Sequence, residues 1–187
     1  MSTQNKKGFT LIELLIVIAI LGILAAAVVV ILNPAELLAQ ARDGTRIADL
    51  DSVKTAASLY LTDVASPSFS GTGYIQNALG TCPFTGVCTT RTGTAIDGTG
   101  WVDVNLSQVS GGSPIPKLPT DPTNNGNYFY AFKTSSASTT FEIDGRLESQ
   151  KQRGKMITDG GNQNICPSTY IESTCFYEIG SAPGLNL

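Results

Sequence analysis

Glu13 is a carboxylate set inside an apolar stretch. Phe9 to Ile12 precede it, and an unbroken apolar run from Leu14 to Leu32 follows it. An ionised side chain at membrane depth costs at least about 2.5 kcal/mol, so such a residue is a functional candidate and needs a partner. We therefore expect Glu13 to meet a positive charge when this stretch is buried.

The sequence lacks the side chains and motifs that enzymes commonly use for catalysis. The chain contains no histidine, which excludes histidine-based triads and zinc proteases and removes the commonest proton carrier near neutral pH. A nucleophile and a base would have to come from Ser, Lys, Asp or Glu, and no motif arranges them. We predict that the chain is not an enzyme.

Four cysteines lie beyond the apolar run, at Cys82, Cys88, Cys166 and Cys175. Their even number and their position on the exported side favour two disulfides in an oxidising compartment. Three pairings are formally possible, and the short separations favour Cys82 with Cys88 and Cys166 with Cys175. Zinc sites use closer pairs, with two to four residues between the cysteines, so we predict no metal at these thiols.

Two other site-like features are weak. Oxygen-bearing side chains crowd a glycine-containing segment, 159–164, so Asp159 is a candidate calcium ligand, but the segment fails the EF-hand spacing and a polar turn is the preferred interpretation. We predict no cofactor, with calcium as the alternative. The formal net charge of −3 makes nucleic acid an unexpected partner.

The N-terminal region is typical of a membrane insertion signal. Lys6 and Lys7 precede the apolar run and are expected to stay in the cytoplasm. As a helix, Leu14 to Leu32 would be about 28 Å long, which matches a hydrocarbon core of about 30 Å. A conventional secretory signal is disfavoured, because the apolar run continues past the small residues Ala25 to Ala27.

A second helix is predicted beyond the apolar run. Asn33-Pro34 should kink the chain, since proline removes a helical hydrogen bond. Apolar residues then recur at helical spacing from Ala35 to Val64, opposite charged faces, so an amphipathic helix is expected there. The proline in Ala-Ser-Pro-Ser, residues 65 to 68, should end it.

The rest of the chain is rich in Gly, Ser, Thr and Asn, with short β-rich runs. We expect an α+β fold in which a small antiparallel sheet packs on the C-terminal half of the long helix. The predicted strands are 101–106, 127–133, 139–147 and 175–179, and the helix face they bury is Leu50, Val53, Ala57 and Tyr60. The predicted division is a leader at 1–8, a hydrophobic transmembrane helix at 9–32, an amphipathic helix at 33–65 and a β-rich head at 66–187.

The run Lys7-Gly8-Phe9-Thr10-Leu11-Ile12-Glu13-Leu14 resembles the class III signal of type IV pilins and type II secretion pseudopilins. The resemblance implies that prepilin peptidase cuts between Gly8 and Phe9 and methylates the new amino terminus at Phe9. It also implies that Glu13 neutralises the terminal amine of a neighbouring subunit during filament assembly. The implied partners are the membrane, an inner-membrane assembly platform and further copies of the chain.

Three functions stay open at this point. The chain could be the structural subunit of a pilus, held first in the inner membrane by one span and then displayed in an extracellular filament. It could instead be a major pseudopilin of a type II secretion system, which residues 118–148 resemble more loosely, whereas the disulfides and the unmatched segment 66–117 favour a pilus. The third reading is a membrane-anchored binding module that never polymerises.

Overall fold

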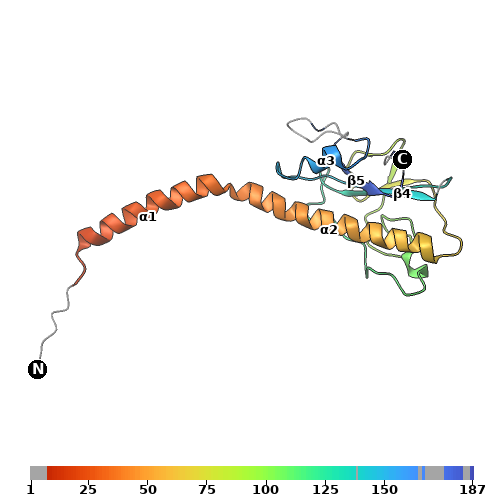
Figure 1. The fold of residues 1–187 in the computed structure, drawn as a ribbon, viewed down its shortest axis with the longest axis horizontal. Coiled ribbons are helices and arrows are strands. Elements are labelled where there is room, and N and C mark those ends of the chain that lie inside the picture. The colour runs from red at the N-terminus through yellow and green to blue at the C-terminus, as the bar shows by residue number, and fades with distance from the viewer. Residues whose placement is uncertain (1–7, 138, 164–165, 167–174, 183–185) are drawn as a thin grey trace, which may run out of the picture. The chain divides into compact units, whose positions relative to one another are not determined.

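The computed structural model describes residues 8–137, 139–163, 166, 175–182 and 186–187. Most of the predicted leader, residues 1–7, lies outside the described residues. The chain divides into two compact units, Met1–Leu38 and Ala39–Leu187, each of which is described by itself. Figure 1 shows the two long helices of the chain and the strands of the second unit.

The first helix, α1 (Leu11–Leu32), is apolar on all sides. It ends at Asn33, whose backbone is left-handed with a φ of 41°, a conformation that asparagine tolerates better than most residues. The second helix, α2 (Pro34–Asp63), begins directly after it, and proline is well suited to a first helical position because its missing N–H has no helical acceptor. The predicted interruption at Asn33-Pro34 is thus a break of one residue between two helices.

The buried side of α2 follows helical spacing along the second unit. Its apolar members are Ala39, Leu50, Val53, Ala56, Ala57 and Tyr60, and Asp43 and Arg46 are buried on the same side. The predicted face of Leu50, Val53, Ala57 and Tyr60 is therefore the face that the head covers.

Five strands form one sheet in the order β2-β1-β3-β4-β5. They are β1 (Gly73–Ile75), β2 (Cys88–Thr90), β3 (Tyr130–Ser135), β4 (Thr140–Gly145) and β5 (Tyr177–Gly180). All neighbours are antiparallel except β1 and β2, which run parallel, so the sheet is mixed rather than wholly antiparallel as predicted. The connection 76–87 is about a dozen residues long, which is the length that a parallel return requires.

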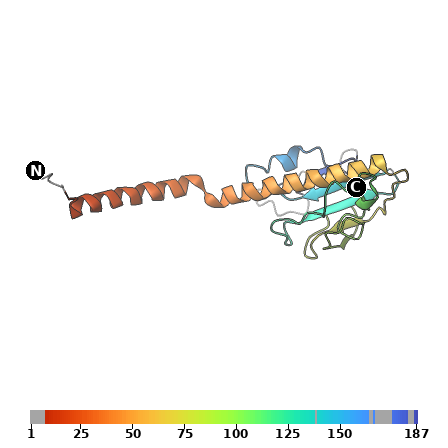
Figure 2. The ribbon, with the colours of Figure 1, turned by 90° about the horizontal axis from the view of Figure 1, so that it is seen from below.

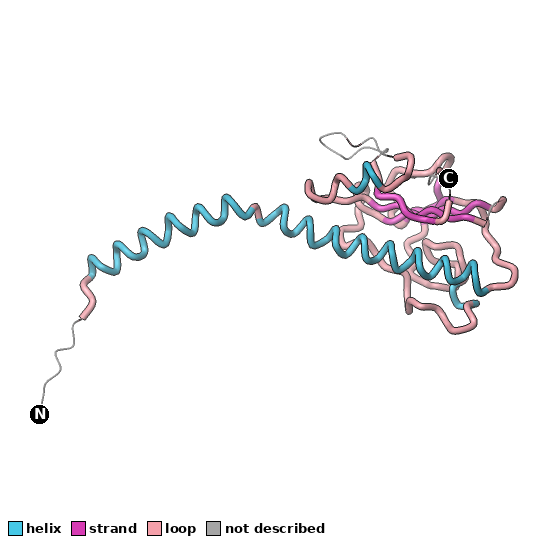
Figure 3. The backbone as a smooth tube through the Cα atoms, in the orientation of Figure 1, coloured by secondary structure: helices cyan, strands magenta, loops and turns pink. Residues whose placement is uncertain are grey.

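The two faces of the sheet bury different side chains. The face toward α2 carries Tyr130 and Phe132 of β3 with Phe141 and Ile143 of β4, and these pack in one apolar cluster with the buried residues of α2. Figures 2 and 3 show α2 running alongside the sheet. A second, smaller cluster around Phe129 and Phe176 covers the other face. The sheet is therefore buried on both sides.

The prediction of a strand at 101–106 is wrong. This segment forms turns that lead into a short 3₁₀ helix, η1 (Leu106–Gln108), and its backbone bonds go to other loops: Trp101 N donates to Gly93 O, and Leu106 N donates to Ile96 O. Trp101, Val102, Val104 and Leu106 are nevertheless buried in the main cluster. The apolar pattern of this segment correctly indicates that its side chains are buried. It does not indicate a strand, because these side chains pack in the core without strand pairing.

Both disulfides lie in the second unit. Cys82 is joined to Cys88, the first residue of β2, across 5.4 Å between their Cα atoms, and Cys166 is joined to Cys175 across 4.8 Å. The two links close short loops, as the spacing of the cysteines favours.

Arg46 anchors α2 to a loop of the head. Its side chain is fully buried, and its Nε and Nη2 donate to the carboxylate of Asp121 at 2.7 and 3.1 Å. Its Nη1 donates to Asp43 at 2.9 Å, and its guanidinium lies over the ring of Tyr128 at 4.8 Å from the centroid. One buried cation thus joins a helix and the segment before β3.

The carboxylates around Arg46 are themselves held by backbone amides. Asp43 accepts from the N–H groups of Glu148 and Ser149 at 2.8 and 2.7 Å, and Asp121 accepts from Thr123 N at 2.7 Å. Removing the guanidinium would therefore leave two buried carboxylates without a counter-charge. The free-energy cost of these unpaired charges exceeds the net stabilisation that the intact ion pair provides.

We expect Arg46→Met to lower the free energy of unfolding of the chain by about 3–5 kcal/mol, because it strands Asp43 and Asp121. Urea unfolding in mild detergent, followed by the fluorescence of the single buried tryptophan, Trp101, measures it. The control is Arg42→Ala, which breaks a partly exposed pair with Glu148 and should cost about 1 kcal/mol or less. Equal losses in the two variants would contradict the anchoring role.

Candidate functional site at the N-terminal helix

Thr10 and Glu13 form a capping box at the start of α1. Thr10 has an extended backbone, and its hydroxyl accepts from Glu13 N at 3.3 Å. In return, Glu13 Oε2 accepts from Thr10 N at 2.9 Å and from the Thr10 hydroxyl at 2.7 Å. The side chain of each residue thus satisfies a backbone N–H of the other, which fixes where the helix begins.

The capping box gives Glu13 a partner within its own chain. Thr10 is neutral, so the carboxylate keeps its negative charge, which is favoured at a helix N-terminus by the helix dipole. A carboxylate has about four acceptor positions, and the bonds to Thr10 leave some of them open. The geometry therefore leaves room for the cation that the sequence analysis expects.

The role of Thr10 was missed in the sequence analysis, although the signal is present in the sequence. A threonine followed three residues later by a glutamate, just before an apolar run, is the pattern of a capping box. Glu13 is therefore an acceptor for a backbone amide at the helix start as well as a charge that needs a cation.

Gly8 and Phe9 precede the helix and are exposed. Phe9 is 85% exposed, and no atom comes within 4 Å of the position that a Cβ on Gly8 would take. The peptide bond between them lies outside α1, so a peptidase can reach it without unwinding a helical turn.

The surface of α1 is apolar and exposed. The window Leu11–Val29 has a mean hydropathy of 3.0, and none of it is buried within the described residues. By length and composition this is one helix that could cross a membrane. A helix that is apolar all round needs an apolar environment on every side, which water does not provide.

The other predicted site residues lie in the second unit. The four cysteines are paired in their disulfides. Asp159 follows the short helix α3 (Lys155–Thr158), and its two oxygens accept from Gly161 N at 3.1 Å and Glu178 N at 2.9 Å. Asn164, at the end of the candidate calcium segment, lies outside the described residues. Asp159 thus accepts hydrogen bonds from its own turn and from β5, and its role as a calcium ligand stays a prediction.

Comparison with known proteins agrees with the geometry of this N-terminal segment. Residues 3–29 match the family described as the prokaryotic N-terminal methylation motif. The chain thus carries a prokaryotic N-terminal methylation motif at its N-terminus, on an α+β architecture.

The matching relatives are fimbrial proteins of Dichelobacter nodosus. A type IV major fimbrial protein FimA is 39% identical over 72 residues, which are 38% of this chain and 45% of the relative. A second FimA and a fimbrial protein are each 48% identical over 54 residues, which are 29% of this chain and 34% of the relative. The chain thus spans less than half the length of these curated relatives. No solved structure matches the chain.

Replacing Thr10 by valine removes the hydroxyl that bonds both the amide and the carboxylate of Glu13. Loss of such an N-cap costs about 1 kcal/mol, so the Glu13 amide should exchange with deuterium about fivefold faster in detergent micelles, as NMR can measure. Thr10→Ser keeps a hydroxyl and should behave as the unmodified chain. Unchanged exchange in Thr10→Val would count against the capping box.

Proposed function

We propose that this chain is the structural subunit of a type IV pilus-like filament and that assembly through α1 is its function. The observation that carries the proposal is an exposed helix that begins within a methylation-motif signal and is apolar apart from one carboxylate, Glu13, at its start. A soluble protein would have to bury this helix. A filament gives every copy of it an apolar environment.

Processing is the first step of the proposed function. Prepilin peptidase cuts between Gly8 and Phe9 and methylates the amine of Phe9. The exposed, non-helical backbone at this bond supports the assignment. The cut removes Lys6 and Lys7, the charges that hold the leader on the cytoplasmic side, and creates a new α-amino group.

Neutralisation of this amine is the second step. The new α-amino group and the carboxylate of Glu13 are opposite charges that both enter an apolar environment, where an unpaired ion is costly. The amine of one copy therefore pairs with Glu13 of a neighbouring copy. Glu13 is prepared for this by Thr10, which holds the carboxylate at the helix start in the single chain.

Transfer from membrane to filament is the third step. Before assembly, α1 lies in the inner membrane, where lipid covers it. In the filament, the helices of other copies replace the lipid, so the apolar surface stays away from water throughout, at about 25 cal/mol for each Å². An inner-membrane assembly platform moves the subunit between these environments, and the filament is displayed outside the cell.

The proposal assigns no reaction and no nucleic-acid partner to the chain. The names of the matching relatives, which are fimbrial, favour a surface pilus over the short filament of a secretion system. A secretion pseudopilin would share the signal at Gly8, Phe9 and Glu13, and fibres seen on the cell surface by electron microscopy distinguish the two.

The test combines the mass of the mature N-terminal peptide with sedimentation of material sheared from the cell surface. We expect a chain that starts at methylated Phe9 and pellets as filaments. Glu13→Ala should still be cut but should reduce the pelleted fraction at least about tenfold, because the buried amine loses its counter-charge.

Two controls make this experiment specific. Glu13→Asp keeps the negative charge and should recover part of the pelleted fraction, and Asp51→Asn, which changes an exposed carboxylate of α2, should pellet as the unmodified chain does. A chain that retains Met1, or that stays unassembled with and without Glu13, would instead indicate an anchored module.

A further inference from the structure

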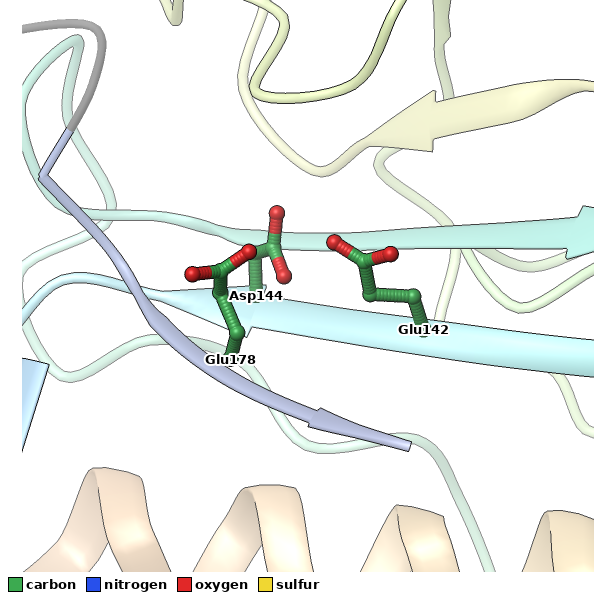
Figure 4. Close-up of side chains that lie close together, drawn as sticks. All are labelled: Glu142, Asp144 and Glu178. Carbon is green, nitrogen blue, oxygen red and sulfur yellow. The ribbon is translucent and has the colours of Figure 1, made fainter. Parts of the chain in front are cut away.

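Three acidic side chains meet on the face of the sheet that points away from α2. Glu142 and Asp144 are two residues apart on β4 and therefore share a face, and Glu178 on β5 stands directly opposite Asp144 in the ladder. Figure 4 shows the carboxylate of Asp144 between those of Glu142 and Glu178. One carboxylate oxygen from each residue lies within 4.8 Å of the others.

All three side chains are removed from water. Asp144 and Glu178 are 0% exposed and Glu142 is 1% exposed. Three like charges at this separation repel one another strongly where water is excluded. The cluster therefore needs a compensating positive charge.

Asp144, at the centre of the cluster, has no donor. Both of its oxygens are buried, and neither accepts a hydrogen bond from any residue in the described part of the chain. Buried polar atoms in folded proteins are nearly always satisfied, so a buried carboxylate with two open oxygens indicates a ligand.

The two outer carboxylates are positioned by backbone amides. Glu178 accepts from Asn162 N at 3.3 Å and from Gln163 N at 2.8 Å, and Glu142 accepts from Leu187 N at 2.9 Å. A carboxylate oxygen that accepts one such bond keeps another lone pair. These amides fix the orientation of the acids, as outer partners commonly do for metal ligands.

One basic side chain beside the cluster is directed elsewhere. Lys133 is the cross-strand neighbour of Glu142 on β3, but its Nζ donates to the carbonyl oxygen of Thr85 at 2.8 Å. Among the described residues, no ion pair joins a cation to Glu142, Asp144 or Glu178.

We propose that Glu142, Asp144 and Glu178 bind one calcium ion. The donors are all carboxylate oxygens, which suit a hard cation. Two oxygens that bind the same Ca²⁺ at about 2.3–2.6 Å can be as much as about 5 Å apart, so the separation of these oxygens is compatible with one shared ion. Mg²⁺ binds at about 2.0–2.1 Å and keeps several waters, for which a buried cluster is poorly suited.

The segment 159–163 closes over the site. Glu178 is held by amides of this segment, and a Cβ on Gly161 would collide with the carboxylate of Glu178, so only glycine permits the close approach. Asp159 accepts from the backbone N–H of Glu178. The calcium candidate of the sequence analysis is thus adjacent to the proposed ligands and supports one of them, while the ligands themselves lie on the strands.

The test uses the full chain in detergent micelles after treatment with EDTA and dialysis. Calorimetric titration with CaCl₂ should show one binding site per chain. At a Ca²⁺ concentration 100 times the dissociation constant, the thermal unfolding midpoint seen by Trp101 fluorescence should rise by about 5–10 °C. MgCl₂ should bind at least about tenfold more weakly, because it retains its waters.

Asp144→Asn keeps the size of the central ligand and removes its charge, so it should abolish both the heat of binding and the rise in midpoint. Asp51→Asn, on the exposed side of α2, should retain both. The titration of the unmodified chain decides the matter even where a variant fails to fold. No heat with CaCl₂, equal binding of Mg²⁺, or unchanged binding by a folded Asp144→Asn would overturn the proposal.

Discussion

The uncovered apolar surface of α1 is the constraint on which the function of this chain depends. From Leu11 to Val29 the helix offers no polar face, and none of this window is buried within the described residues. Exposed in water, such a surface would drive aggregation, so it needs an apolar environment that covers it. The capping box of Thr10 and Glu13 gives this helix a defined start and leaves a single charge at a known place on it.

The second unit, by contrast, buries its apolar side chains within its own fold. It does so with a sheet buried on both faces, an apolar face of α2, two disulfides and the buried guanidinium of Arg46. Each face of the sheet has its own chemistry. The face toward α2 is apolar, whereas the other face holds the buried carboxylates of Glu142, Asp144 and Glu178.

Strong local signals made much of the fold predictable. The apolar run and the helical spacing after Pro34 predicted both long helices, and the aromatic alternation around Phe132 and Phe141 predicted β3 and β4. The strands β1 and β2 were missed because they are three residues long and carry little apolar alternation. The segment around Trp101 was misassigned because its apolar residues serve packing without strand pairing.

The sites, like the fold, were predictable only where the signal is local in the sequence. Glu13 stands out because it is alone in an apolar run. By contrast, Glu142 and Asp144 alternate with Phe141 and Ile143, a pattern that ordinarily places acids on a solvated face. Their burial depends on Glu178 and on a second apolar cluster from distant parts of the chain, which no local pattern reveals.

The most direct measurement of the central claim is electron cryomicroscopy of fibres sheared from the surface of cells that produce this chain. The account predicts fibres whose centre consists of α1 from successive copies, with the Glu13 carboxylate of each copy within ion-pair distance of the Phe9 amine of a neighbour. Fibres whose centre is formed by another protein, or in which α1 lies exposed on the outside, would contradict it.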